Sequence, residues 1–299
     1  MEMKKKTPPH FRPSPILPGV PIGLARSALF PVARPDNGGA VVYIFNRRVP
    51  MAAQRGEKLG YRGPRLNQHH ALAWQAVLIA AEGMDAMDGR AFEVSPDMLL
   101  RDMGGQGGDT SQRERLLRWL VELTHARIHY TTRLQKFAGP LLAHVEHTPT
   151  GRLSLRLHPS LREILRNEIL RNDLARKARL GLNALALWLH DFIATHLRPP
   201  ADTVERLRLL SGSALKLPQF RVRLRTALAL LTGPDGLVIE GEIDRFDRLM
   251  IARKAPTRVV ILVPEGEPAQ VKKRAPLPRS KPRQTPTPTR QPCDNPLRL

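Results

Sequence analysis

Residues 211–236 read SGSALKLPQFRVRLRTALALLTGPDG, and this stretch contains the start, the body and the end of one helix. Pro218 suits the first turn of a helix, and Gly233-Pro234-Asp235-Gly236 ends it with a turn. Between them the apolar residues recur at helical spacing and share one face: Phe220, Leu224, Ala227, Leu228 and Leu231. The sequence therefore predicts an amphipathic helix over 218–231 with an arginine-bearing outer face.

The segments around this helix predict a helix-turn-helix followed by a hairpin. Residues 203–210 predict a shorter helix capped by Asp202, and Ser211-Gly212-Ser213 predicts the turn between the two helices. After the longer helix come two β-like runs, 237–240 and 245–253. A helix-turn-helix with a β-hairpin "wing" behind it is the arrangement of a winged-helix domain.

The first half of the chain repeats this order without obvious sequence repetition. A helix that is apolar on most sides is predicted over 67–82, and residues 92–94 predict a short strand. Pro96 suits the first turn of the next helix, with Ser95 as its cap. The Gly-rich stretch 104–108 then predicts a break.

A second helix and a hairpin complete this first unit. Ser111-Gln112-Arg113-Glu114 is a capping-box pattern and predicts a helix over 111–125. Residues 127–133 are β-like. Segments 141–147 and 152–158 flank a Pro/Gly turn, and the second alternates Leu with Ser or Arg, which predicts a hairpin.

Three remaining segments have weaker signals. Residues 40–45 are apolar and predict a strand, whereas 47–65 are basic and predict a loop. Apolar residues at helical spacing predict a helix over 181–196, ahead of the second helix-turn-helix.

We therefore expect an α+β protein with two tandem winged-helix domains, at 59–157 and 158–255. A short N-terminal extension, 24–58, precedes them. The flanking segments 1–23 and 256–299 are rich in proline and basic residues and are expected to be disordered.

The charge indicates a polyanionic partner. There are 48 Lys and Arg against 27 Asp and Glu, a formal net charge of +21. Only nine of those cations, with three acidic residues, lie in 256–299, so the part of the chain expected to fold is itself basic. This favours a nucleic-acid-binding body over a neutral domain with a basic tail.

The outer faces of the second helix of each unit, together with the two hairpins, supply the predicted contacts to double-stranded DNA. Arginine offers a planar fork to guanine or phosphate, and glutamine can pair with adenine. The helix candidates are Ser111, Arg115, Arg118, Gln219, Arg221, Val222, Arg225 and Thr226, and the hairpin candidates are Arg152, Arg156, Arg245 and Arg248. Glu122 and His125 are also expected on the outer face of helix 111–125. An exposed arginine is more often merely solvated, so the prediction depends on two matching units in one basic chain.

The sequence predicts no catalytic, metal or cofactor site. The one cysteine, Cys293, cannot form a disulfide within the chain or build a Cys-based zinc finger. The adjacent His69 and His70 do not match the alternating histidines and tyrosine of a relaxase, and 104–108 lacks the Lys-Ser/Thr of a phosphate-binding loop. We expect a non-enzymatic, cytoplasmic protein, because the sequence has neither a membrane-spanning apolar run nor a signal-peptide core.

Several stretches resemble the TrfA-type replication initiators of broad-host-range plasmids. They are LARSALF (24–30), YRGPRLNQ (61–68) with Trp74-Gln75, ALWLHDF (186–192) with His196, LRLLSGS (207–213), FRVRLR (220–225) and the wing-like 237–244. The first 23 residues and the basic tail match nothing in that family. The resemblance implies two winged-helix domains that bind direct repeats (iterons) in origin DNA, promote origin opening and recruit host replication proteins. It also implies a monomer-dimer equilibrium that restrains copy number.

Two other functions remain open. One is a winged-helix transcriptional repressor, and the other, from a different class, is a relaxase or nuclease. Direct repeats beside an AT-rich stretch would favour an initiator, a single operator palindrome would favour a repressor, and metal-dependent nicking of supercoiled DNA would favour a nuclease.

Overall fold

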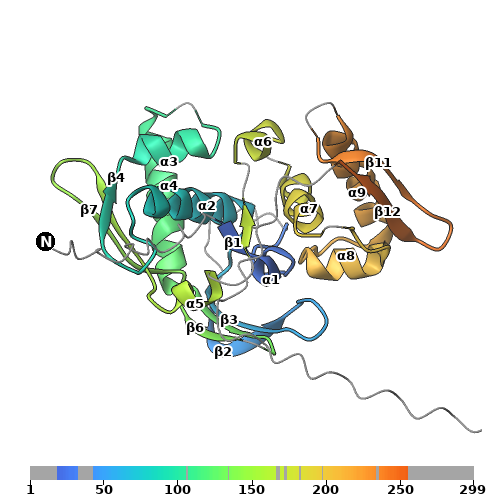
Figure 1. Cartoon of the computed structure of the whole chain (residues 1–299), viewed down its shortest axis with the longest axis horizontal. Coiled ribbons are helices and arrows are strands. Elements are labelled where there is room, and N and C mark those ends of the chain that lie inside the picture. Colours follow the sequence, from blue (N-terminus) through green and yellow to red (C-terminus); the bar gives the residue numbers. More distant parts are fainter. Residues whose placement is uncertain are drawn as a thin grey trace, which may run out of the picture. The chain divides into compact units, whose positions relative to one another are not determined.

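The computed structural model has an α+β architecture in which the strand pairs, throughout the described residues, are antiparallel (Figure 1). It describes residues 19–32, 43–105, 107–133, 135–165, 169–171, 174–181, 183–196, 198–233 and 236–254. Residues 1–18 and 255–299, which hold nearly all of the two segments predicted to be disordered, lie outside the described residues.

The N-terminal extension forms ordered structure. It contains the end of α1 (Ile22–Ala25) and β2 (Tyr43–Met51), and β3 (Lys58–Pro64) follows. β1 (Gly19–Pro21) and the start of α1 lie in the segment 1–23, so the prediction of disorder is wrong for residues 19–23, where Val20 and Ile22 are buried in the core. The predicted strand 40–45 overlaps the start of β2, and its residues 40–42 lie outside the described residues.

The prediction of a loop over 47–65 is wrong, because β2 and β3 occupy most of it and pair with each other. Lys58 and Arg62 are exposed on β3 while Leu59 and Tyr61 are buried. Two of the basic residues that suggested a loop therefore lie on the solvent side of a strand. β3 also pairs with β5 (Arg127–Thr131), which pairs with β6 (Lys136–Gly139), giving the sheet order β2-β3-β5-β6.

The predicted apolar helix is α2 (Gln68–Gly83), and twelve of its sixteen residues are buried. Asn67 caps it by accepting hydrogen bonds from the backbone N–H groups of His69 and His70. Trp74 has 0% exposure. The helix lies in the middle of the first core because its sequence offers no continuous polar face.

The first helix-turn-helix contains α3 (Pro96–Asp102) and α4 (Thr110–His125), preceded by β4 (Phe92–Val94). The capping-box prediction is wrong: Asp109 caps α4, and its carboxylate accepts the N–H of Ser111 at 2.9 Å and its hydroxyl at 3.0 Å. The helix therefore begins one residue earlier than predicted.

The predicted hairpin after α4 is confirmed as β7 (Leu142–His147) and β8 (Leu153–Leu157), and β8 also pairs with β4. Three short elements that the sequence did not predict follow: α5 (Leu161–Leu165), β9 (Ile169–Arg171) and α6 (Leu174–Arg179). β9 pairs with β1, so residues far apart in sequence form a two-stranded sheet.

The second half contains the predicted elements in the predicted order. They are α7 (Ala184–Ala194), α8 (Val204–Leu210), α9 (Leu217–Thr232), β11 (Val238–Ile243) and β12 (Arg248–Arg253). The two-residue strand β10 (Asp202–Thr203) before α8 was not predicted. The predicted cap of α8 is wrong by one residue, because the Thr203 hydroxyl accepts the Arg206 N–H at 3.2 Å while Asp202 pairs with Leu249 in the sheet.

The apolar side chains form two clusters. The first takes residues from β1 to α7, including α2, α4 and the β7–β8 hairpin. The second takes residues from α7, α8, α9 and the β11–β12 hairpin, together with Ile22 of α1. Helix α7 contributes to both, since Leu187 belongs to the first cluster and Trp188 to the second.

Candidate nucleic-acid interface

The turn between α3 and α4 is held by one carboxylate. Asp97 of α3 accepts two hydrogen bonds from the Arg113 guanidinium of α4, at 2.6 and 2.7 Å, and one from the Gly108 N–H at 3.1 Å. The Arg113 guanidinium is the main reason why the pKa of Asp97 is lowered. Gly104, at φ +88°, lies against α6, where a Cβ would meet Ala178 at 2.5 Å. These contacts fix the angle between the two helices.

Helix α4 has the predicted leucine face and a basic outer face. Leu116, Leu120 and Leu123 all have 0% exposure. On the opposite side Ser111, Arg115, Arg118 and His125 are exposed. Arg115 donates to the carbonyl and hydroxyl of Ser111 at 3.2 and 3.3 Å. Within the described residues no hydrogen bond or ion pair engages Arg118.

The predicted outward position of Glu122 is wrong. Its side chain is buried, and its carboxylate lies 2.6 Å from Nε2 of His70 on α2. His69 stacks on Trp119 with ring centroids 5.0 Å apart, so α2 covers this flank of α4. Its negative charge is therefore absent from the outer face of α4, where it would have repelled phosphate.

The β7–β8 hairpin presents Arg152 and Arg156 to solvent, while Leu153, Leu155 and Leu157 fill the core. Arg152 forms an ion pair with Glu93 of β4 at 3.4 Å and donates to its carbonyl at 3.0 Å. For Arg156 the described part of the chain shows no such partner.

The turn and the inner face of the second helix-turn-helix match the prediction. Gly212 adopts φ +64°, and a Cβ there would meet Pro31 at 2.6 Å. The five residues predicted to face inward from α9 are those that are buried: Phe220, Leu224, Ala227, Leu228 and Leu231. Gln219, Val222 and Thr226 are exposed.

The three arginines of α9 have different surroundings. Arg221 donates to both carboxylate oxygens of Asp247, at 2.7 and 2.9 Å, and so ties α9 to the β11–β12 hairpin. Arg223 and Arg225 are exposed, and neither has an ion-pair partner among the residues that the structure describes. Arg225 lines an open groove of about 680 Å³ between α9 and β11, with Leu228 and Glu242.

The turn of the β11–β12 hairpin carries a feature that the sequence analysis missed. Phe246 is 60% exposed, and the guanidinium carbons of Arg245 and Arg248 lie 4.7 and 5.0 Å from its ring centroid. Asp244 accepts the backbone N–H groups of Phe246 and Arg248 and pairs with the Arg248 guanidinium at 2.8 Å. The run Arg245-Phe246-Asp247-Arg248, an aromatic between arginines at the start of the predicted second strand, is the signal that could have found it. The strand begins later than predicted, because β12 starts at Arg248 and residues 245–247 belong to the turn.

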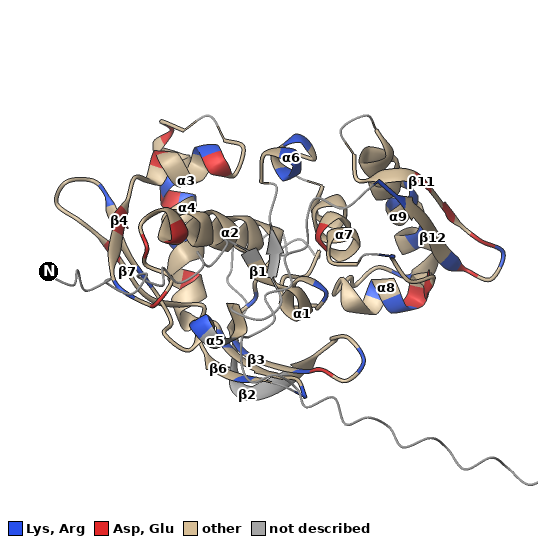
Figure 2. Cartoon of the chain, in the orientation of Figure 1, with Lys and Arg blue, Asp and Glu red and all other residues tan. Residues whose placement is uncertain are grey.

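The predicted site residues therefore fall into two groups, one on each helix-turn-helix and its hairpin, and both groups contain arginines (Figure 2). Acidic side chains also occur, and Glu240 and Glu242 are exposed on β11. In the described part of the chain no three His, Cys, Asp or Glu side chains gather as metal ligands. No helix there is long and apolar enough to cross a bilayer.

Two solved structures of domains 2 and 3 of RctB are similar to this chain. One, a selenomethionine derivative, has a TM-score of 0.47 and 11% identity and covers 72% of this chain and 84% of its own. The other has a TM-score of 0.44 and 10% identity, and the match covers 76% of this chain and 93% of the RctB chain. No protein-family model and no curated protein matches the sequence.

Proposed function

We propose that this protein binds double-stranded DNA through two winged-helix units. The observation that carries the proposal is the repeated arrangement of a helix-turn-helix followed by an antiparallel hairpin, in a chain of net charge +21. In each unit the second helix, α4 or α9, has one apolar buried face and an exposed face with arginines. We call α4 and α9 the candidate recognition helices, because the second helix of this motif enters the major groove.

The side chains at these positions suit both parts of DNA binding. Arg118, Arg156 and Arg223 are exposed, so their guanidinium groups are available for phosphate. Gln219, Val222 and Arg225 offer an amide, an apolar contact and a fork, which are the groups that distinguish base edges. Arg245 and Phe246 place a cation and an apolar ring at the tip of a wing.

We further propose that the protein is a non-enzymatic, cytoplasmic replication initiator of the TrfA type. It would bind iterons, promote origin opening, recruit host replication proteins and exchange between monomer and dimer. This proposal rests on the resemblance to the TrfA-type initiators. Most residues in the segments that carry it are buried in the core, among them Leu24, Trp74 and Trp188. Residues 220–225, in contrast, include the exposed Val222, Arg223 and Arg225.

Two experiments test the two parts separately. Nuclease footprinting on the DNA that flanks the gene tests binding, and protection of repeated sequences in the same orientation is expected. Initiation is tested by cloning the gene with its flanking DNA on a plasmid that cannot otherwise replicate. Protection of a single palindrome together with no replication in any host that expresses the protein would indicate a repressor instead.

A further inference from the structure

The two apolar clusters meet where α2 lies beside α7, and the contact there is mostly apolar. Twelve of the sixteen residues of α2 are buried, and so is every residue of α7 from Leu185 to Ala194. The hydrophobic effect itself has no directional preference, and side-chain packing limits two helices to a small set of crossing angles. A directional polar contact at the same place would narrow that set further.

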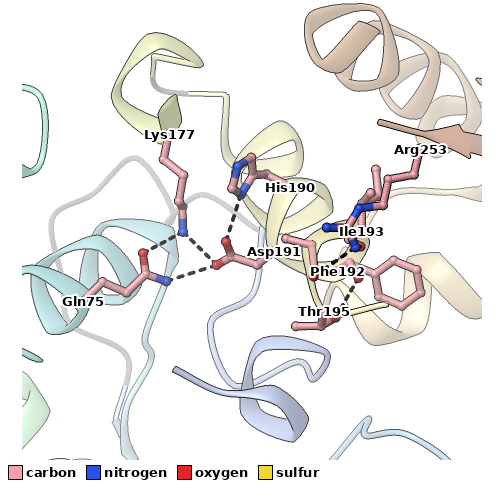
Figure 3. A network of polar contacts seen from close by, with 9 residues as sticks. Gln75, Lys177, His190, Asp191, Phe192, Ile193, Thr195 and Arg253 are labelled. Carbon is pink, nitrogen blue, oxygen red and sulfur yellow. Dashed lines mark hydrogen bonds and ion pairs between the residues drawn. The ribbon is translucent and has the colours of Figure 1, made fainter. Parts of the chain in front are cut away.

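A buried polar cluster lies at this contact (Figure 3). The Gln75 amide of α2 donates to Oδ2 of Asp191 on α7 at 3.0 Å. The Lys177 ammonium of α6 donates to the same Oδ2 at 2.7 Å and to the Gln75 carbonyl oxygen at 2.8 Å. Nδ1 of His190 lies 3.2 Å from the other oxygen, Oδ1. Both oxygens of Asp191 are thus engaged, by side chains from three helices.

The cluster contains a charged pair with almost no access to water. Lys177 is 0% exposed and Asp191 is 5% exposed. Burial is the largest single influence on the pKa of Asp191 and would raise it, but the Lys177 ammonium and the His190 imidazole together outweigh burial and lower that pKa to about 2, so the carboxylate is ionised at neutral pH. Hydrogen bonds between charged groups are short and directional. Rotation of α7 against α2 would break the hydrogen bond from Gln75 to Asp191 and leave a buried carboxylate with one donor fewer.

Further polar contacts extend from this cluster toward both candidate recognition helices. On one side, the His70–Glu122 contact of 2.6 Å joins α2 to α4. On the other, Arg253 of β12 donates to the carbonyls of Ile193 and Ala194 at the end of α7, both at 3.2 Å. The Arg221–Asp247 pair then joins the hairpin to α9.

We propose that Gln75, Lys177 and Asp191 are positioning residues that hold α4 and α9 at one relative orientation, so that the protein binds two DNA segments only at a fixed spacing. This inference rests on the proposed DNA binding. A buried ion pair is often no more stabilising than apolar residues of the same volume, so its presence here is better explained by orientation than by stability.

The test uses Gln75→Leu in the full-length protein. This change removes the amide that joins α2 to α7 and leaves the Lys177–Asp191 pair in place. Gln68→Leu is the matched control, because Gln68 is a buried glutamine of the same helix whose amide donates to the Phe30 carbonyl instead. The paired change Lys177→Met/Asp191→Leu, which removes both charges together, serves as the second variant if Gln75→Leu does not fold.

The first measurement needs no DNA. Spin labels at Val121→Cys on α4 and Leu230→Cys on α9, with Cys293→Ser, report the distance between the two helices. We expect one narrow distance distribution for the wild type and for Gln68→Leu, and a broad one for Gln75→Leu. An equally narrow distribution in Gln75→Leu and in the paired variant would overturn the proposal.

The second measurement uses the footprinted DNA with one base pair inserted between its two protected halves. The insertion turns one half by about 34° relative to the other, since the duplex repeats about every 10.5 base pairs. We expect the wild type and Gln68→Leu to lose affinity about tenfold, and Gln75→Leu to lose less than about threefold. Equal losses in all three proteins would refute the fixed spacing. A wild type that binds no DNA would refute the proposed function, while the label distances would still decide whether the cluster positions the helices.

Discussion

At the scale of single residues, the structure separates the predicted arginines into paired and unpaired groups. Arg152, Arg221 and Arg248 each have a carboxylate partner. Arg118 and Arg225 have none among the described residues. A paired guanidinium has fewer free N–H groups for DNA, so the unpaired arginines are the stronger candidates for direct contact with bases or phosphate.

The first prediction concerns Arg225. If its guanidinium contacts a base edge, Arg225→Ala should cost about 1–3 kcal/mol on the cognate sequence and relax the preference at one position. If it contacts only phosphate, the loss of affinity should be similar on all sequences. The slope of log K against log salt should then become less steep by about one. Titrations of cognate and random duplexes at several salt concentrations distinguish the two roles.

Leu224→Ala is the control for Arg225→Ala, because the neighbouring leucine has 0% exposure. It should lower the free energy of unfolding by about 2–5 kcal/mol, which Arg225→Ala should not do. Unchanged affinity of Arg225→Ala for both duplexes would remove this position of α9 from the interface.

The second prediction concerns His196. Burial, followed by the charges of Arg26 and Arg253, lowers the pKa of its imidazole to about 4, and its Nδ1 lies 2.7 Å from the Phe192 carbonyl. Between pH 6.5 and pH 4 the unfolded chain therefore binds a proton that the folded protein excludes. Stability should be fully present above pH 6.5 and decline as the pH falls, by up to about 1.4 kcal/mol per pH unit.

Urea unfolding at pH 7 and pH 5 measures this decline, with His196→Gln as the comparison. His69, His158 and His190 also have lowered pKa values, mainly through burial, so the decline should be reduced in His196→Gln and not abolished. The same decline in both proteins would show that His196 does not contribute.

At the scale of elements, the start of α4 distinguishes two capping schemes. The Asp109 carboxylate accepts the Ser111 N–H, whereas Glu114 was expected to complete a capping box. Asp109→Ala should cost about 1 kcal/mol of stability, within the range for loss of an N-cap. Glu114→Ala should change the stability by less than about 0.5 kcal/mol, as exposed substitutions usually do. Urea unfolding of both variants is the measurement. A larger loss of stability in Glu114→Ala than in Asp109→Ala would indicate that the capping box forms after all.

Elements with strong local signals were predictable from the sequence. Helix α9 has a proline in its first turn, carries five buried apolar residues on one face and is capped by a glycine at its end, so propensity, pattern and packing agree. The same holds for the β7–β8 hairpin, where Leu153, Leu155 and Leu157 alternate with polar residues. In such segments the neighbours along the chain determine the structure.

Elements that depend on distant partners were not predictable. β9 is three residues long and exists through its pairing with β1, and α6 is a short helix with a basic sequence. Glu122 is buried because α2 covers its side of α4, which no spacing within α4 could indicate. The cluster of Gln75, Lys177 and Asp191 joins residues up to 116 positions apart, so sequence patterns could not find it.

At the scale of the whole molecule, the positive charge is spread over folded and flanking parts of the chain. The exposed arginines of the two helix-turn-helix units occupy fixed places, while residues 256–299 add nine Lys or Arg and three Asp or Glu outside the described residues. Arginines on the candidate recognition helices would select sequence by their geometry. The cations of residues 256–299 can add affinity for any duplex, because a contact to phosphate releases counterions whatever the base sequence.

The last prediction follows from this division of charge. Deletion of residues 256–299 should leave folding and the choice of site unchanged, and should weaken binding to cognate and random duplexes by similar factors. The salt dependence of binding should fall as well, because each lost phosphate contact lowers the slope of log K against log salt by about 0.9. Competition titrations of the full-length and truncated proteins, with thermal melting of both, measure these quantities. A truncated protein that still binds DNA but no longer distinguishes cognate from random sequence would show that the tail contacts bases, and that α4 and α9 are not the main source of specificity.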